Sequence, residues 1–450
     1  MKIILLSGGS GKRLWPLSND TRSKQFLKLL KAPNGEYESM VQRIARQVKE
    51  SGIEADITIA TSVTQYDSIT NQLGGDVDIV TEPERRDTFP AIALSASYLL
   101  KEKRCDPSEV VVVMPSDSYV DGSYFATISK MAEVAAGDDV DMVLMGITPT
   151  EPSTKFGYIV PNQQATNGDL ITVNRFTEKP NLATATQLIE QGAVWNGGVF
   201  AFKLSYIASI IDKYITAESF DEIRSRYSEF RKISFDYEVV EKATSIGLVP
   251  YSGQWSDLGT WNSLVTKIED HCIGNVTTGC HCKNTHIINE LETPIVCLGT
   301  TDLMVAASPD GILVSSKEAS VELKSYADSI QARPMYEERR WGTYRVLGHE
   351  HFSDGHNALT KLLCLKAGCS ISYQYHNLRE EIWTFVDGEG LLVLDGEVIK
   401  VSRGSVFHIK AGQKHTVRAT TDLQIIEVQT GSNLVEEDII RLDWDWSCHL

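Results

Sequence analysis

The sequence predicts an α/β protein with a doubly wound, mostly parallel sheet in its first part and an all-β arrangement in its last part. From the start to about residue 265, short apolar runs of strand length alternate with segments of helical periodicity, as in parallel sheets joined by crossover helices. Beyond residue 339, strand-like runs follow one another with glycine turns between them. We therefore expect a sheet domain at residues 1–267, a β-rich connector with a linker helix at 268–335, and an all-β domain at 336–450.

Each element of the first part follows from its own pattern. Apolar runs predict strands at 2–6, 56–61, 77–80, 110–114 and 142–147. Helical periodicity predicts helices at 39–49, 90–103 and 124–136. Pro90 lies at the start of the strongest helix, where a missing N–H costs no hydrogen bond. Ligands of such sheets bind beyond the carboxyl ends of the strands.

The connector and the last domain lack this alternation. From residue 274 to about 317, short β-branched segments alternate with Gly, Asn, Thr and Asp, and one helix is expected at 321–328. The stretch 274–286 fits a turn or two of a β-helix. In the last domain, turn signals such as Asp387-Gly388 and Asp395-Gly396 separate the expected strands.

The composition indicates a soluble, globular protein of two or three domains. Of the 450 residues, 42% are hydrophobic and 23% charged, and no apolar run approaches the ~18 residues of a membrane-spanning helix. The chain starts with one lysine before a strand-like run that ends in glycines, which is unlike a secretory signal. We expect a cytoplasmic protein without a membrane partner.

The net charge bears on the kind of ligand, and the spacing of the cysteines bears on disulfides and zinc. A net charge of −17 argues against a nucleic-acid partner, because duplex binding needs extended basic stripes. Small phosphorylated ligands are compatible with this negative net charge, since a few local cations and backbone amides suffice to bind a phosphate. The eight cysteines are expected to be free thiols. Cys280-His281-Cys282 lacks a paired Cys-x-x-Cys, so zinc is not expected there.

The loop that leaves the first strand has the composition of a phosphate-binding loop. Its glycines let backbone N–H groups approach an anion, and the adjacent cations bring charge to a leaving pyrophosphate. The loop consists of Gly8, Gly9, Ser10 and Gly11, followed by Lys12 and Arg13. The alternative is a simple tight turn between strand and helix. Trp15-Pro16 and the cation Lys24 follow shortly after the loop and make this alternative less favourable. The spacing excludes a dinucleotide fingerprint and a Walker A loop.

Two acids follow expected strands of the same domain, and a third precedes an expected helix. Asp117 ends the strongest buried strand, and Asp257 precedes a helix start. Carboxylates at such places suit Mg²⁺, which takes one or two of them with phosphate oxygens and water, although a turn or helix cap is the alternative for each alone. Glu82 ends the 77–80 strand, where its carboxylate suits the N1–H and amine of guanine, and a surface turn acid is an equal alternative.

The stretches GGSGKRLWPLS and KQFLKL closely resemble the signature of the sugar-1-phosphate nucleotidyltransferases, and within that group the mannose-1-phosphate guanylyltransferases. The resemblance covers about residues 1–270 and implies a Rossmann-like nucleotide-diphospho-sugar transferase fold. It implies that Asp117 and Asp257 form the metal pair and that Arg13 and Lys24 neutralise phosphate charge. It extends to the nucleotide-binding stretch with Arg86, Asp87 and Thr88, in which Asp87 replaces the usual Asn.

Three later stretches match the sugar half of the family in the same order. They contain Lys155-Phe156-Gly157-Tyr158-Ile159, Phe176-Thr177-Glu178-Lys179-Pro180 and Trp195-Asn196-Gly197-Gly198, and Phe235-Asp236-Tyr237-Glu238 follows. The resemblance implies that Gly157 and Tyr158 lie at the sugar, that Glu178 accepts from its hydroxyls, and that Lys179 pairs with its phosphate. Asn196 and Asp236 complete the implied sugar-phosphate site.

The family implies transfer of GMP from GTP to α-D-mannose 1-phosphate, giving GDP-mannose and pyrophosphate, with Mg²⁺ at the transferase site. GDP-mannose then feeds polysaccharide biosynthesis. A nucleotidyltransferase for another base or another sugar 1-phosphate is the alternative among enzymes. A non-catalytic sensor of nucleotide sugars is the alternative outside them, which the metal pair disfavours. The sequence leaves the oligomeric state open, with a homo-oligomer among the alternatives.

The last domain resembles a cupin β-barrel of the type II mannose-6-phosphate isomerases. The motif positions are Gly368, Gln374, His376, Glu381 and Gly388, then Gly404, Ala411-Gly412 and His415, with Gln374 in the first histidine position. Gln374, His376, Glu381 and His415 are candidate ligands of a divalent transition metal. The resemblance implies a bifunctional enzyme that also interconverts fructose 6-phosphate and mannose 6-phosphate, with Arg379 as the phosphate contact. Three further histidines of the usual signature are replaced, by Asn377, Leu378 and Ile382, so a structural or regulatory cupin is the alternative.

Overall fold

The computed structural model describes residues 1–9, 11–167, 170–330 and 332–449, and the chain forms two compact units. The first unit comprises Met1–Leu14, Ser23–Asp270 and Lys317–Val321. The second comprises Trp15–Arg22, His271–Ser316 and Glu322–Leu450. The expected sheet domain therefore corresponds to most of the first unit, whereas connector and last domain share the second.

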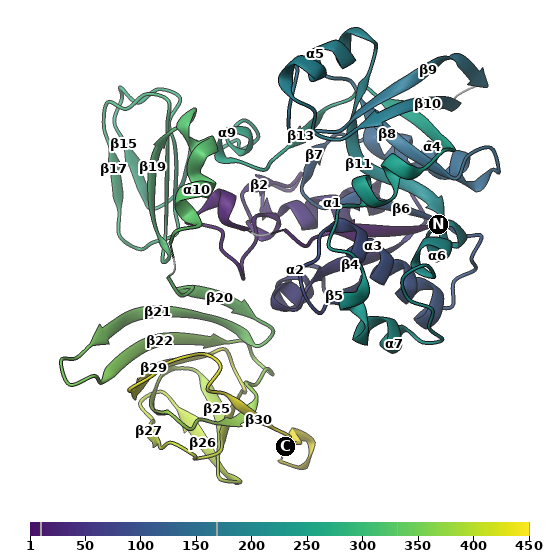
Figure 1. Ribbon diagram of the computed structural model, residues 1–450. Helices are drawn as coiled ribbons and strands as arrows, with labels where there is room; N and C mark the ends of the chain where they lie inside the picture. The colour runs from purple at the N-terminus through teal and green to yellow at the C-terminus, as the bar shows by residue number, and fades with distance from the viewer. Residues whose placement is uncertain (10, 168–169, 331, 450) are drawn as a thin grey trace. The chain divides into compact units, whose positions relative to one another are not determined.

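The first unit is built on one nine-stranded sheet of order β5-β4-β1-β6-β11-β8-β12-β10-β9 (Figure 1). Its strands are β1 (Lys2–Leu6), β4 (Asp56–Ser62), β5 (Asp78–Glu82), β6 (Val110–Pro115), β8 (Met142–Ile147), β9 (Tyr158–Asn167), β10 (Leu170–Thr177), β11 (Val194–Lys203) and β12 (Ile246–Tyr251). β1 pairs in parallel with both β4 and β6. The predicted doubly wound α/β fold is confirmed, with β10 and β11 as antiparallel strands in its second half.

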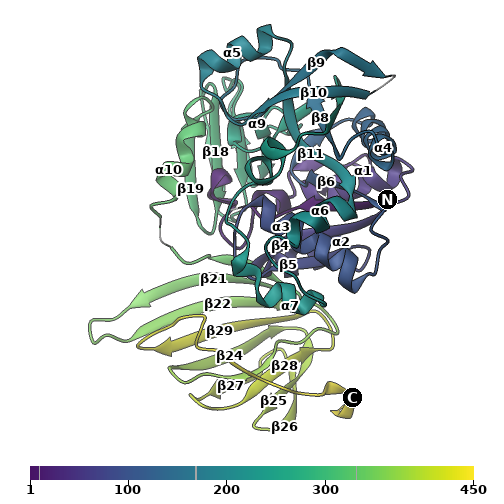
Figure 2. The ribbon, with the colours of Figure 1, turned by 45° about the vertical axis from the view of Figure 1, so that its right-hand side comes forward.

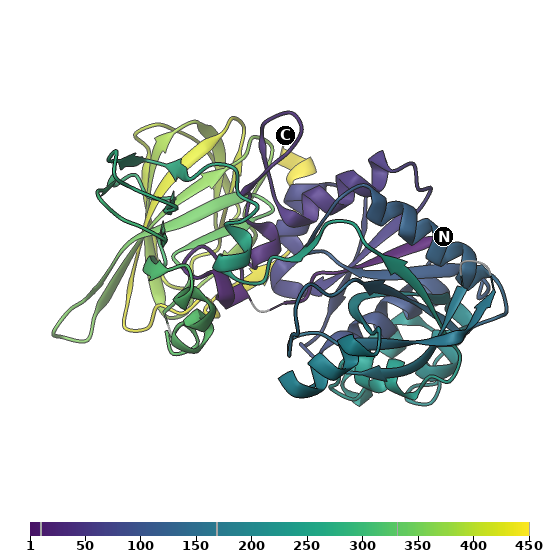
Figure 3. The same cartoon turned by 90° about the horizontal axis from the view of Figure 1, so that it is seen from above.

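Helices cover both faces of this sheet (Figure 3). Successive residues of a strand point to opposite faces, and in these strands both sets are apolar, so both faces need a cover. Ile3 and Leu5 pack with helices α1 and α4, whereas Ile4 packs with α3 and α6. The helices are α1 (Met40–Glu50), α2 (Tyr66–Leu73), α3 (Thr88–Ser97), α4 (Ser123–Ala136), α5 (Leu182–Glu190), α6 (Leu204–Ile211), α7 (Phe220–Ser225), α8 (Phe235–Glu238) and α9 (Trp261–Leu264).

The helix expected at 90–103 begins two residues earlier, at Thr88, and ends in a π-helical turn, Tyr98–Glu102. It starts there because the Asp87 side chain accepts a hydrogen bond from the Thr88 N–H, at 2.8 Å. Pro90 accordingly lies within the first turn. The cap places the start of α3 directly after β5 and Glu82.

The connector part of the second unit stacks short parallel strands. β14 (Cys272–Gly274), β16 (His286–Asn289) and β18 (Leu303–Ser308) form one parallel run, and β15 (Val276–Thr278) pairs in parallel with β17 (Ile295–Cys297). This stacking is that of successive coils in a parallel β-helix. The antiparallel strand β19 (Gly311–Ser316) closes the first sheet, and helix α10 (Leu323–Ala327) follows.

Residues 15–22 of the signature stretch belong to this second unit. The Ser308 hydroxyl donates to the Pro16 carbonyl at 2.6 Å, and the Asn19 amide donates to Asp310 at 2.6 Å. Arg22 pairs with Glu290 at 2.7 Å. These residues are therefore bonded to the connector, whereas the glycines before them belong to the first unit.

The last domain is all-β and consists of two sheets, and Figure 2 shows five strands of the larger, β21 to β27 in the order given below, one after another. The larger contains β20 (Tyr336–Arg339), β21 (Gly342–His351), β22 (Asn357–Leu365), β29 (Leu423–Gly431), β24 (Arg379–Asp387) and β27 (Val406–Ile409). The smaller contains β26 (Glu397–Ser402), β25 (Glu389–Leu394), β28 (His415–Ala419), β23 (Tyr373–Tyr375) and β30 (Ile440–Leu442). Apolar residues such as Trp383 and Ile425 fill the space between the sheets. Over the residues that the structure describes, no helix is long and apolar enough to cross a membrane.

Candidate functional site

The first unit brings its candidate residues to the carboxyl ends of β1, β5 and β6. The chain passes from β1 to β4 on one side and later reaches β6 on the other side of β1. The strand order therefore reverses at β1, and parallel sheets bind ligands at such a point. Gly8, Glu82 and Asp117 all follow or end these strands.

The glycine loop after β1 is held by side chains from neighbouring segments. The Ser23 hydroxyl donates to the Gly9 carbonyl at 2.9 Å, and the Gln25 amide donates to the Ser7 carbonyl at 2.8 Å. A Cβ on Gly8 would lie 3.0 Å from a Glu82 carboxylate oxygen, whereas a Cβ on Gly9 would meet no atom within 4 Å. The backbone at Gly9 is thus open to a ligand of the loop.

The remaining loop residues form a short 3₁₀ turn, Gly11–Leu14. Gly11 is buried, Lys12 is half-buried and the Arg13 side chain is exposed. Ser10, the third residue of the predicted loop, lies outside the described residues. The charge of Arg13 opposes the rise in the pKa of Lys24.

Lys24, Asp117 and Asp257 converge on one point. The Lys24 ammonium lies 2.6 Å from an Asp117 oxygen and 3.6 Å from an Asp257 oxygen. A short ladder between β7 (Ser118–Val120) and β13 (Trp255–Asp257) places Asp257 opposite Ser118, the neighbour of Asp117. The two predicted metal ligands and a predicted catalytic cation therefore form one cluster, although they are far apart in sequence.

This cluster keeps Lys24 charged. Burial alone would lower the pKa of Lys24, but the carboxylates of Asp117 and Asp257 outweigh it and the pKa is raised. Both aspartates keep part of their surface open, at 30% and 39% exposure of their side chains. Carboxylates that share one cation and remain accessible are suited to a divalent ion and phosphate oxygens.

Glu82 is buried beside the glycine loop. The Tyr227 hydroxyl donates to a Glu82 oxygen at 2.6 Å. Burial raises the pKa of Glu82 to about 7, against the opposing effects of Tyr227 and Arg85. This carboxyl is therefore poised to change protonation near neutral pH, and Tyr227 favours its ionised form.

The nucleotide-binding stretch after Glu82 is tied to the start of α3. The Arg86 guanidinium donates to the Phe230 carbonyl at 3.0 Å, and the Thr88 hydroxyl accepts from the Phe235 N–H at 2.8 Å. Asp87, which caps α3, has a φ of 73°. The side chains of Arg86, Asp87 and Thr88 thus hold the backbone of this turn.

The predicted sugar-phosphate residues form a second cluster. Lys179 lies 2.7 Å from Glu178, and the Asn196 amide donates to Asp236 at 2.7 Å. The Asn196 N–H donates to the Gly157 carbonyl at 2.8 Å. Burial, followed by the charge of Glu178, raises the pKa of Asp236 to about 7. The Lys179 side chain keeps 53% of its surface exposed, so its charge remains available to an anion.

Tyr158 is the predicted sugar residue whose side chain lies elsewhere. Its ring is fully buried in the hydrophobic core, and its hydroxyl donates to the Ser153 carbonyl at 3.0 Å. Its backbone is next to the sugar cluster, because the preceding residue Gly157 accepts a hydrogen bond from Asn196. The strand alternation explains this, because successive residues of β9 point to opposite faces.

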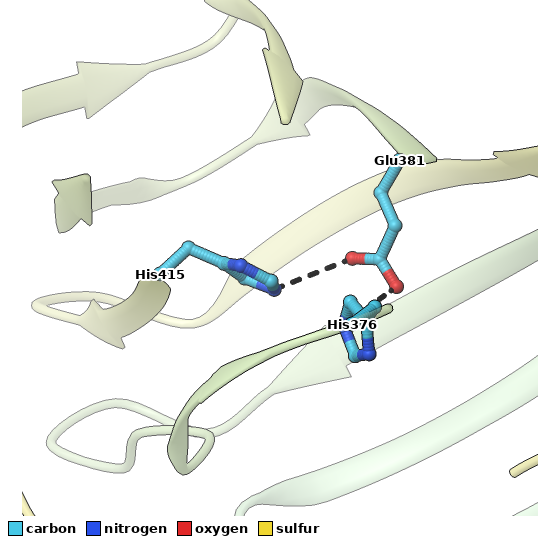
Figure 4. Close-up of side chains that lie close together, drawn as sticks. All are labelled: His376, Glu381 and His415. Carbon is cyan, nitrogen blue, oxygen red and sulfur yellow. Dashed lines mark ion pairs between the residues drawn. The ribbon is translucent and has the colours of Figure 1, made fainter. Parts of the chain in front are cut away.

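The cupin domain gathers His376, Glu381 and His415 in its interior (Figure 4). All three are buried, and their ligand atoms lie within 4.8 Å of one another. His376 Nε2 is 3.1 Å from Glu381, and His415 Nε2 is 3.5 Å from it. Within the described part of the chain, His415 Nε2 is buried without a hydrogen-bond partner, as expected of a nitrogen that can ligate a metal. Gln374 lies opposite His415 in the strand pairing and 3.4 Å from His376.

Glu381 is held in this group by further contacts. Arg379 Nε donates to one of its oxygens at 2.9 Å, and the Trp383 indole N–H donates to the other at 3.1 Å. Burial raises the pKa of Glu381, but His376 and His415 outweigh it and hold the pKa well below its usual range. Arg379, expected as a phosphate contact, is only 3% exposed and positions Glu381.

The polar interior extends beyond these ligands to residues that the motifs did not indicate. Lys361, 4% exposed, lies 2.7 Å from Glu436. Gln429 donates to Glu427 at 2.6 Å. Burial and the charge of Glu381 raise the pKa of Glu427 to about 7. The signal available in the sequence was a charged residue at an inward position of an apolar strand, as at Lys361 and Glu427.

Comparison with known proteins identifies the family of each of the two parts of the chain. Residues 2–272 match the family described as Nucleotidyl transferase, and residues 329–444 match the one described as Mannose-6-phosphate isomerase C-terminal. The chain therefore belongs to the nucleotidyl transferase family and is an enzyme of that class with an isomerase-type C-terminal domain.

Relatives over nearly the full chain specify the group further. The xanthan biosynthesis protein XanB of Xanthomonas campestris pv. campestris (strain B100) is 31% identical, over 98% of this chain and 97% of its own. The mannose-1-phosphate guanylyltransferase of Salmonella muenchen is 30% identical, over 98% and 97%. A crystal structure from Thermus thermophilus, described as a mannose-1-phosphate geranyltransferase, has a TM-score of 0.60 and 28% identity, over 74% of this chain and 99% of that one. The chain is thus similar along its length to the guanylyltransferases with a fused isomerase-like domain.

Proposed function

We propose that this enzyme transfers GMP from GTP to α-D-mannose 1-phosphate, with GDP-mannose and pyrophosphate as products. The convergence of Lys24, Asp117 and Asp257 where the strand order reverses carries the proposal. Mannose 1-phosphate and GTP are supported by the relatives named as mannose-1-phosphate guanylyltransferases. Action in the cytoplasm and assembly into a homo-oligomer stay predictions from the sequence.

In this reaction, a phosphate oxygen of mannose 1-phosphate bonds to the α-phosphorus of GTP, and the bond from that phosphorus to the β-phosphate oxygen breaks. The attacking oxygen already carries negative charge, so the step needs no nucleophilic side chain. The protein must align two anions and balance their charge. Lys24 and Arg13 supply positive charge to the phosphates, and Lys179 holds the sugar phosphate.

The aspartates fit a divalent ion because both already direct an oxygen to one cation, the Lys24 ammonium. Asp117 and Asp257 would hold Mg²⁺, which when bound neutralises phosphate charge and orients the α-phosphate. The glycine loop would contact the triphosphate through its N–H groups. Glu82 would accept hydrogen bonds from the guanine N1–H and amine, which distinguishes guanine from adenine.

A product assay tests this proposal. Purified protein is incubated with GTP, ATP, UTP or CTP and with mannose 1-phosphate or glucose 1-phosphate, and the nucleotide sugar is identified by chromatography and mass. We expect GDP-mannose with GTP, and a loss of about 10²-fold or more in rate for Asp117→Asn. Asp139→Asn, an exposed aspartate outside the cluster, is the matched control. Unchanged turnover in Asp117→Asn would exclude the proposed metal ligand.

A second function is favoured by the buried polar interior of the cupin. We propose that this domain interconverts fructose 6-phosphate and mannose 6-phosphate. His376, Glu381, His415 and Gln374 fit a divalent transition metal, and the unpartnered His415 nitrogen supports this fit; such an ion would supply charge to the sugar oxygens. Glu427, with its pKa near 7, is suited to move a proton between neighbouring sugar carbons. Isomerisation that appears with Mn²⁺, Co²⁺ or Zn²⁺ would support this, and a Glu427→Gln variant with unchanged rate would contradict the role of Glu427.

A further inference from the structure

The hairpin of β21 and β22 contains two histidines that lie outside the cupin motifs. The two strands lie side by side and are joined at one end by the turn 352–356 (Figure 1). His349 and His351 are at that end of β21, where they pair with Leu359 and Asn357 of β22. Successive side chains of a strand point to opposite faces, so these two histidines, two residues apart, share one face.

The two imidazole rings lie next to each other. Their centroids are 4.2 Å apart, and the ring planes are inclined by 52°. Both residues are exposed to solvent, so an ion can reach the rings and the rings can adjust to it. A transition metal takes imidazole nitrogens at ~2.0–2.1 Å. Two neighbouring rings on one face of a strand can therefore each direct one nitrogen to the same ion.

Asn357 determines which nitrogen of His351 can be a ligand. The Asn357 amide nitrogen donates to the Ser432 carbonyl at 2.9 Å, so the amide oxygen is the atom that faces His351 Nδ1, at 2.6 Å. An amide oxygen only accepts, so Nδ1 carries the proton and donates to it. Nε2 of the neutral ring then has the lone pair. Histidines that bind metals are held in this way, with the other ring N–H donated to an oxygen.

The charges around His349 are compatible with a bound cation. The partial burial of its ring lowers its pKa, and the charges of His351 and Arg333 lower the pKa further, against the opposing charge of Glu350. The ring is therefore neutral at pH 7, which is the form that ligates a metal. Arg333 is paired with Glu436 at 3.1 Å, so its positive charge is largely balanced.

We propose that His349 and His351 bind one divalent transition-metal ion, with water in its remaining coordination positions. Imidazole nitrogens are ligands of Zn²⁺, Ni²⁺ and Cu²⁺, whereas Mg²⁺ takes oxygen ligands. The site is separate from the buried group of His376, Glu381 and His415. It goes beyond the proposed function, because neither proposed reaction uses the two hairpin histidines.

Isothermal titration calorimetry with Ni²⁺ tests this site on the full chain after treatment with a chelator. We expect His349→Ala and His351→Ala each to bind one Ni²⁺ fewer per chain than the wild type. Both positions are exposed, so both variants should melt at the temperature of the wild type in the absence of metal. His408→Ala, an exposed histidine on another strand of the same sheet, is the matched control and should keep every site. An unchanged number of sites and unchanged affinities in either His349→Ala or His351→Ala would overturn the proposal.

Asn357 supplies a second readout, because it positions His351 without being a ligand. Asn357→Ala removes the oxygen that holds Nδ1–H and should weaken Ni²⁺ binding at this site by about tenfold or more. Asn357→Asp keeps an accepting oxygen at the same place and should bind Ni²⁺ at least as tightly as the wild type. Wild-type affinity in Asn357→Ala would overturn the orientation inferred for His351, and with it the proposed site.

Discussion

At the scale of single residues, the transferase unit contains two carboxyls that titrate near neutrality for different reasons. Glu82 owes its raised pKa first to burial, and Tyr227 opposes the shift. Asp236 owes its raised pKa to burial and then to the charge of Glu178. Both are at sites where a ligand hydrogen bond is expected, so the pH dependence of binding reports on them.

Removal of the Tyr227 hydroxyl should shift the pH dependence of GTP binding. Glu82 must be ionised to accept from guanine, so affinity should rise as the pH increases through about 7. Tyr227→Phe removes a donor that stabilises the ionised form, so the midpoint should move up by about one pH unit. Dissociation constants measured across the neutral range test this. Tyr206→Phe is the control, and a midpoint that stays in place in Tyr227→Phe would contradict the role of Glu82.

At the scale of elements, short strands with few hydrogen bonds bring distant residues together. The β7–β13 ladder places Asp257 beside Asp117, and the start of β9 places Gly157 against Glu178. A Cβ on Gly157 would lie 2.5 Å from a Glu178 oxygen and 2.8 Å from the Phe176 ring. Glycine is therefore required here by close approach, without a left-handed backbone.

Gly157→Ala should damage the use of the sugar phosphate more than that of the nucleotide. The added methyl forces Glu178 to move and disturbs its 2.7 Å pair with Lys179. We expect kcat/KM for mannose 1-phosphate to fall by about 10²-fold, because small displacements at a reacting centre have effects of that size. GTP binding should stay close to wild type. Gly75→Ala, where a Cβ meets no atom within 4 Å, is the control; an equal loss for both substrates would contradict this interpretation.

At the scale of the whole molecule, the two candidate sites lie in units with separate hydrophobic cores. The sheet of the first unit is covered by its own two clusters, and the cupin has a third around Trp383 and Ile425. The contacts described above for each site come from side chains of its own unit. Activities carried by such units are expected to be separable by mutation.

The two proposed activities should be lost independently. Asp117→Asn should abolish GDP-mannose formation and keep hexose 6-phosphate isomerisation, and His376→Ala should do the reverse. Both rates are measured on the same preparations, with the melting profile as a check on folding. Loss of transfer in His376→Ala, in a protein that melts normally, would contradict the independence of the units.

The predictability of the fold followed the strength of local patterns. The strands at 2–6 and 142–147 were predicted at their observed bounds, because continuous apolar runs bounded by polar residues admit little else. The start of α3 at Thr88 was missed, because its cap depends on the conformation of Asp87. The antiparallel direction of β10 and β11 could not be predicted either, since the alternation of strand and helix says nothing about strand direction.

The sequence by itself determined the class of fold, the glycine loop after the first strand and the residue types available for chemistry, because these depend on local composition and ordered motifs. Only the tertiary structure decided which of these residues meet. It joined Lys24 to Asp117 and Asp257, turned Tyr158 into the core, and placed Tyr227, Lys361 and Glu427 at sites where no motif indicated them. Such contacts link residues that are far apart in the chain, and they arise from strand order and burial that no local segment specifies.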